Sequence, residues 1–169
     1  MRSIFSVIAA IVLCVGWTAG ARERKTSDEA FSQEMQWFKD AKFGIFIHWG
    51  IYSVNGDGAS WPIFNKKVTL EDYMKQADFF TAENYDPQAW AKLFKEAGAR
   101  YAVMTTKHHD GMALWDTKAG ELDVVEKTPA GRDLIAPFAE ALRAEGLKVG
   151  LYFSWLDWAN NDYGTLGKM

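Results

Sequence analysis

Apolar residues along this chain follow two patterns, short continuous runs and stripes with helical spacing. The continuous runs cover residues 43–47, 101–106 and 147–153, and runs of this length predict strands. The run over 101–106, which is apolar and β-branched, is typical of a buried strand. Stripes spaced three and four residues apart predict helices over about 70–78, 86–97 and 133–144. A mixed-polar segment with helical spacing, residues 27–39, predicts an additional helix before the first strand.

Residues at the expected helix ends agree with this assignment. Asp86 is a good N-cap, Pro87 fits the first helical position, and Gly98 is a common helix stop. Asp133 is the expected N-cap of the last helix, and Pro137 predicts an irregular first turn there. The clearest unit of the chain is therefore a capped helix followed at once by a strand.

The order of the elements indicates the fold class. Strands alternate with helices through short links, which predicts an α/β domain with a parallel sheet and right-handed crossovers. Periodicity alone does not distinguish a barrel from an open sheet. No Gly-x-Gly-x-x-Gly or Walker-type sequence follows a strand, which argues against dinucleotide-binding and P-loop folds. A complete eight-stranded barrel needs roughly 250 residues, so a barrel reading makes this chain the first part of one.

The N-terminus has the pattern of a secretory signal. Arg2 precedes an apolar run over residues 4–15, and Ala19-Gly20-Ala21 is an A-x-A cleavage pattern. We expect residues 1–21 to be a signal peptide and the protein to be secreted or periplasmic, with an uncleaved membrane anchor as the alternative. Cleavage would remove Cys14, the single cysteine, and leave neither a disulfide nor a thiolate metal ligand.

Composition limits the partners. The formal net charge is -3, which gives no electrostatic case for binding nucleic acid or an anionic membrane. Eight tryptophans suit a neutral substrate with apolar faces, such as a sugar, although core packing is the alternative for each of them.

All three histidines lie at the carboxyl ends of predicted strands, where α/β proteins place their chemistry. His48 follows the first strand, and His108 and His109 follow the second. Adjacent strand residues point to opposite faces, but a loop that begins at Lys107 would let both rings reach one pocket. The functional interpretation is a set of imidazoles that bind a polar ligand, and the alternative is a structural role.

A metal site is a competing interpretation of the same residues. His48, His108, His109 and Asp110 are ligand types that zinc accepts. Adjacent histidines rarely chelate one ion together, because their side chains diverge. We therefore expect no metal and no cofactor.

Catalytic carboxylates are harder to identify. Glycoside hydrolysis needs two acids that flank the scissile bond. The available acids are Asp110, Asp116, Asp123, Asp133 and Asp157, of which only Asp157 follows the third strand near the predicted mouth. No Gly-x-Ser-x-Gly elbow is present, which disfavours serine acyl chemistry.

Four segments resemble the α-L-fucosidases of glycoside hydrolase family 29. They are residues 37–54, with FGIFIHWGIYSV; residues 94–101; residues 105–111, with TTKHHDG; and residues 149–158. The resemblance implies an N-terminal portion of a (β/α)8-like (TIM) barrel over residues 22–169, truncated after about three or four strands. It also implies retaining hydrolysis of terminal α-L-fucose from a fucosylated glycan or oligosaccharide.

The resemblance assigns roles to particular residues. Matched by motif, His48, His108 and His109 would hydrogen-bond the fucose hydroxyls, and Tyr152 and Trp61 would also contact the sugar. Fucose has hydroxyls for imidazoles and a C5 methyl group that suits an aromatic wall.

The chain departs from the family pattern in two ways. Ser60 stands where many relatives have a glutamate, so an acidic pocket residue is absent. The family's nucleophile and acid/base are later carboxylates, expected beyond Met169, so we expect this chain alone to be inactive. A sugar-binding protein without catalysis and a metal-dependent hydrolase remain the rival hypotheses.

Overall fold

The computed structural model describes residues 27–56 and 58–160, and the predicted signal peptide lies outside them. The chain divides into two compact units, residues 1–36 and 37–169. The predicted helix over 27–39 is two helices, α1 (Ser27–Glu34) and α2 (Gln36–Ala41). Only Met35 separates the two helices, and its N–H still donates a helical hydrogen bond to the Phe31 carbonyl at 3.0 Å.

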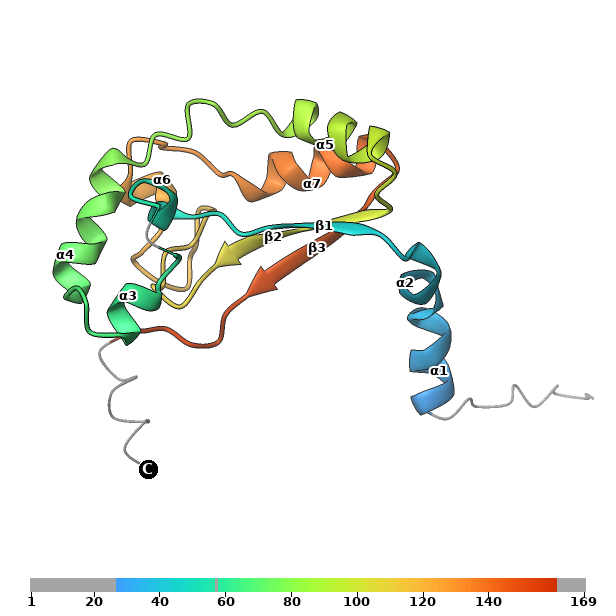
Figure 1. The fold of residues 1–169 in the computed structure, drawn as a ribbon, viewed down its shortest axis with the longest axis horizontal. Coiled ribbons are helices and arrows are strands. Elements are labelled where there is room, and N and C mark those ends of the chain that lie inside the picture. Colours follow the sequence, from blue (N-terminus) through green and yellow to red (C-terminus); the bar gives the residue numbers. More distant parts are fainter. Residues whose placement is uncertain (1–26, 57, 161–169) are drawn as a thin grey trace, which may run out of the picture. The chain divides into compact units, whose positions relative to one another are not determined.

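A three-stranded parallel sheet organises the second unit. Its strands are β1 (Gly44–Ile47), β2 (Tyr101–Lys107) and β3 (Lys148–Phe153), in the order β1-β2-β3 (Figure 1). All three predicted strands are therefore present, and the predicted parallel α/β arrangement is confirmed.

Helices fill the connections between the strands. Between β1 and β2 lie η1 (Ile51–Ser53), α3 (Trp61–Phe64), α4 (Leu70–Met74), η2 (Lys75–Phe79) and α5 (Pro87–Glu96). Between β2 and β3 lie α6 (Val124–Lys127) and α7 (Ile135–Ala144). Helices α5 and α7 lie side by side above the sheet (Figure 1). None of the helices in the described part of the chain is long and apolar enough to span a membrane.

Asp86 is the N-cap of α5 as predicted, whereas the N-cap of α7 is Leu134, one residue after the predicted Asp133. Asp86 accepts a hydrogen bond from the Ala89 N–H at 2.9 Å at the start of α5, and Gly98 follows that helix with φ +86°. The Asp133 carboxylate accepts from the Ile135 N–H at 2.7 Å, which satisfies a free donor at the start of α7. Pro137 is the third residue of α7, where the missing N–H costs no helical hydrogen bond.

The core lies between the sheet and helices α5 and α7, and extends under the loops at the carboxyl ends of the strands. Continuous apolar burial of this kind supplies most of the stabilising free energy of a small domain. Its largest fully buried apolar side chains are Ile51, Tyr73, Met104, Leu114, Val124, Leu134, Phe138 and Leu142.

The other face of the sheet is crowded next to two glycines. A Cβ atom at Gly44 would lie 2.2 Å from the Tyr101 ring, and one at Gly150 would lie 2.6 Å from a methyl group of Val103. Each glycine faces its register partner on β2. Large and small residues thus alternate across this face, as they do inside small barrels.

Gly150→Ala should therefore lower the free energy of unfolding by about 1–3 kcal/mol, because the added methyl group would overlap the Val103 side chain. Val103→Ala in the Gly150→Ala background should recover part of that loss. Urea unfolding measures both changes.

Gly120→Ala is the matched control, because nothing lies within 4 Å of the added Cβ atom. A Gly150→Ala loss no larger than that of the control would contradict the crowding of this face.

Candidate active site

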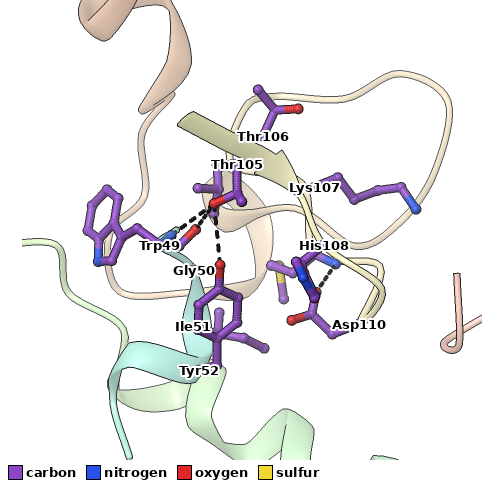
Figure 2. A pocket seen from close by; sticks show the side chains of 11 residues that line it. Trp49, Gly50, Ile51, Tyr52, Thr105, Thr106, Lys107, His108 and Asp110 are labelled. Carbon is purple, nitrogen blue, oxygen red and sulfur yellow. Dashed lines mark hydrogen bonds between the residues drawn. The ribbon is translucent and has the colours of Figure 1, made fainter. Parts of the chain in front are cut away.

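Thr105, at the carboxyl end of β2, fixes the loop that follows β1. Its hydroxyl oxygen accepts a hydrogen bond from the Trp49 N–H at 2.9 Å, and its O–H donates one to the Trp49 carbonyl at 2.5 Å (Figure 2). The Tyr52 hydroxyl lies 3.3 Å from the same oxygen. Because Thr105 is 1% exposed, water does not compete for these bonds. The backbone on either side of Gly50 is thereby held against β2.

Three histidines and a tyrosine from the ends of all three strands gather in one cluster. The ring centroids of His48 and His108 are 4.7 Å apart, and those of His108 and His109 are 4.2 Å apart. Tyr152, on β3, stacks on His108 with an angle of 29° between the rings and 6.0 Å between the centroids. Strand β2 ends at Lys107, so both adjacent histidines reach the same cluster, as expected for a loop that begins at Lys107.

Aromatic rings border the histidine cluster. The Trp61 ring lies 5.9 Å from His109 and is 48% exposed. The Trp158 ring lies 4.9 Å from His109 and stacks on Phe64 at 5.7 Å. The five predicted sugar-contacting residues therefore lie together.

Trp158 belongs beside the five predicted residues but was not singled out for this place. The signal that could have placed it here is a tryptophan close to the end of a strand, beside the candidate acid Asp157. The structure also pairs two serines, Ser60 and Ser154, with histidines, and no pattern in the sequence predicts these contacts.

Each of the adjacent histidines is bonded through Nδ1 to a serine hydroxyl. Ser60, which is fully buried, pairs with His108, and Ser154, which is 4% exposed, pairs with His109 at 2.6 Å. The residue that stands in place of a pocket acid thus contacts the centre of the cluster.

The histidines are uncharged at neutral pH. Burial, together with smaller contributions from the neighbouring imidazoles of His109 and His48, lowers the pKa of His108 to about 4. Burial also lowers the pKa values of His48 and His109. Neutral imidazoles offer one donor and one acceptor each, which suits hydroxyl ligands.

Asp110 follows the adjacent histidines in the sequence and is 1% exposed. Its carboxylate accepts from the Tyr73 hydroxyl and from the Met112 N–H, both at 3.0 Å. Burial raises the pKa of Asp110 to about 6. These contacts hold the turn that follows His109, so the acid has a structural role.

Asp157 is engaged on both carboxylate oxygens. One oxygen pairs with the Lys107 ammonium at 2.9 Å, and the other accepts from the Ala159 and Asn160 N–H groups at 3.2 Å. Asp157, the candidate acid nearest the carboxyl end of the third strand, therefore stabilises the turn that follows β3.

The remaining candidate acids also have local partners. Asp116 pairs with Lys118 at 2.6 Å, and Asp123 and Asp133 cap the starts of α6 and α7. In the part of the chain that the structure describes, no three His, Cys, Asp or Glu side chains are placed to hold a metal ion together.

The His108 imidazole should titrate with a pKa of about 4 instead of the 6.5 of a free histidine. The unfolded chain takes up this proton at a higher pH than the folded chain does. The stability that His108 contributes is therefore lost as the pH falls from about 6.5 towards 4. An NMR titration of its Cε1–H resonance, assigned with His108→Gln, measures the midpoint. A midpoint at or above that of a free histidine would contradict the burial of this ring.

Comparison with known proteins agrees with this site. The sequence matches the alpha-L-fucosidase family over residues 14–168. The tissue alpha-L-fucosidase of Bos taurus is 39% identical over 137 residues, which cover 72% of this chain and 29% of that protein.

Solved structures give the same result. Alpha-L-fucosidase isoenzyme 1 from Paenibacillus thiaminolyticus is 51% identical with a TM-score of 0.75, over 79% of this chain and 31% of that one. An alpha-L-fucosidase from Bacteroides thetaiotaomicron, trapped as a covalent intermediate with 2-fluoro-fucosyl fluoride, is 38% identical with a TM-score of 0.71. That match covers 78% of this chain and 32% of the other.

The chain thus spans 29% to 32% of the length of these relatives. Within that span the family match, the identities and the fold agree. The chain belongs to the alpha-L-fucosidase family of glycoside hydrolases.

Proposed function

We propose that this chain forms the fucose-binding part of an exo-α-L-fucosidase that acts on fucosylated glycans or oligosaccharides. The observation that carries the proposal is the cluster of His48, His108, His109 and Tyr152 at the carboxyl ends of three parallel strands. Enzymes with parallel sheets place their substrates at this edge.

The chemistry of the cluster suits a neutral sugar. Uncharged imidazoles can donate to and accept from hydroxyl groups without the desolvation cost of an ion. The exposed Trp61 ring and the neighbouring Trp158 ring offer apolar surface for the C5 methyl group of fucose. A site that pairs several hydroxyls discriminates strongly against sugars in which they are missing or inverted.

The proposed architecture is the beginning of a (β/α)8-like barrel over residues 22–169, with residues 1–21 as a signal peptide that directs the protein to the periplasm or the exterior. Two observations support the barrel: the strands are parallel, and on one face of the sheet glycines lie opposite the large side chains of β2. In this arrangement Tyr101 and Val103 belong to the barrel interior.

The proposed reaction retains the anomeric configuration. The trapped covalent intermediate of the Bacteroides thetaiotaomicron relative supports this route for the family. A carboxylate attacks the anomeric carbon while a carboxylic acid protonates the leaving oxygen, and the second group then activates water. Asp110 and Asp157 are already engaged in local hydrogen bonds. We therefore assign both catalytic groups to residues that follow those of this sequence.

The contribution of the present residues is orientation of the sugar. Holding the ring in a fixed pose brings the anomeric carbon into line with the attacking carboxylate. No cofactor takes part in the proposed reaction.

Release of nitrophenol from an aryl α-L-fucoside tests the proposal. We expect activity from a chain extended along the same reading frame and none from the 169-residue chain. In the extended chain, His108→Ala and His109→Ala should lower kcat/KM by about 10- to 100-fold, because each removes a hydrogen bond to the sugar.

Lys118→Ala is the control, since its ammonium contacts only the exposed Asp116 among the described residues. Activity of the short chain would place a nucleophile among the present residues. An extended chain that binds fucose but releases no nitrophenol would favour the sugar-binding protein. Loss of folding in the histidine variants would favour a structural role.

A further inference from the structure

The adjacent histidines of the cluster differ in the serine that each one contacts. Ser60 lies at the N-cap position of α3, yet its hydroxyl makes no capping bond, and Pro62 occupies the first turn. The hydroxyl pairs instead with His108 Nδ1. Ser154 follows β3 and has two partners, His109 Nδ1 and the Leu156 carbonyl.

The two partners of Ser154 determine where the proton of His109 lies. A hydroxyl has one hydrogen, and a backbone carbonyl can only accept. The Ser154 hydroxyl donates to the Leu156 carbonyl at 3.0 Å. In the 2.6 Å contact between His109 Nδ1 and the Ser154 hydroxyl, the imidazole N–H is then the donor and the hydroxyl oxygen is the acceptor. His109 therefore carries its proton on Nδ1 and has a bare Nε2.

The surroundings of Ser60 lead to the opposite assignment for His108. Ser60 is fully buried, and among the described residues the hydrogen-bond partner of its hydroxyl is His108 Nδ1. If Nδ1 carried the proton, the buried hydroxyl hydrogen would have no acceptor, which is costly. The Ser60 hydroxyl therefore donates to a bare Nδ1, and His108 carries its proton on Nε2.

Both Nε2 atoms are available to a ligand. Neither has a hydrogen-bond partner among the described residues. Among the described residues, Gln76 Oε1 is the only fully buried side-chain nitrogen or oxygen atom that lacks a hydrogen-bond partner. The Nε2 atoms of His108 and His109 therefore reach accessible surface. Both rings are neutral at pH 7, so the tautomers persist there.

We propose that Ser60 and Ser154 are positioning residues that hold His108 and His109 in opposite tautomers. The pair then presents an N–H donor at His108 Nε2 next to a bare acceptor at His109 Nε2. Sugar hydroxyls both donate and accept, so neighbouring hydroxyls can satisfy the two sites at once. The identity of the ligand as fucose rests on the proposed function, whereas the tautomers do not.

Nitrogen NMR of the ¹⁵N-labelled chain at pH 7, without sugar, tests the assignment. The bare and protonated nitrogens of a neutral imidazole have well-separated shifts, and His108→Gln and His109→Gln assign the rings. We expect His108 with Nε2–H and His109 with Nδ1–H. The same tautomer in both rings, or the reverse pair, would overturn the proposal.

Ser60→Ala and Ser154→Ala test the part that the serines play. Each should convert only its own histidine to a mixture of tautomers, and each should weaken L-fucose binding by about fivefold, the value of one ordinary hydrogen bond. Ser53→Ala is the matched control, because that exposed hydroxyl donates to the Gly50 carbonyl at 2.7 Å.

Unchanged tautomers in properly folded serine variants would overturn the positioning role. Opposite tautomers in a wild-type chain that does not bind L-fucose would support the tautomer assignment and contradict the proposed function.

Discussion

The hydroxyl of Thr105 is the interaction on which the site depends most. It bonds to both backbone groups of Trp49 and lies next to the Tyr52 hydroxyl, so it joins the end of β1 to the end of β2. His48 therefore lies between the last paired residue of β1, Ile47, and a backbone segment that is bonded to β2. The strand pairing and this link together hold the His48 and His108 rings 4.7 Å apart.

The charges near the cluster are arranged so that the cluster itself is neutral. Burial keeps the imidazoles unprotonated, and the Lys107 ammonium is paired with Asp157 at 2.9 Å. Asp110 is buried with both carboxylate oxygens engaged. The surface offered to a ligand is therefore one of hydrogen-bonding groups and aromatic rings, which agrees with a neutral sugar.

The elements that the sequence predicted well are those with local signals. The helix between Asp86 and Gly98 has a cap, a first-turn proline and a stop residue, and all three act as expected. The four-residue helices α3 and α6 are not among the helices that the sequence predicts, since one turn is too short for a periodic stripe. The place of His108 followed from the geometry of parallel sheets, whereas its contact with Ser60 depends on tertiary packing across 48 residues.

A crystal structure of the chain with bound L-fucose would test the central claim, that the histidine cluster at the strand ends binds the sugar. The account predicts sugar hydroxyls within hydrogen-bonding distance of His48, His108 and His109, with the C5 methyl group against the Trp61 ring. Fucose bound elsewhere, for example in the groove of about 800 Å³ beside Trp155, with the imidazoles unoccupied, would contradict it.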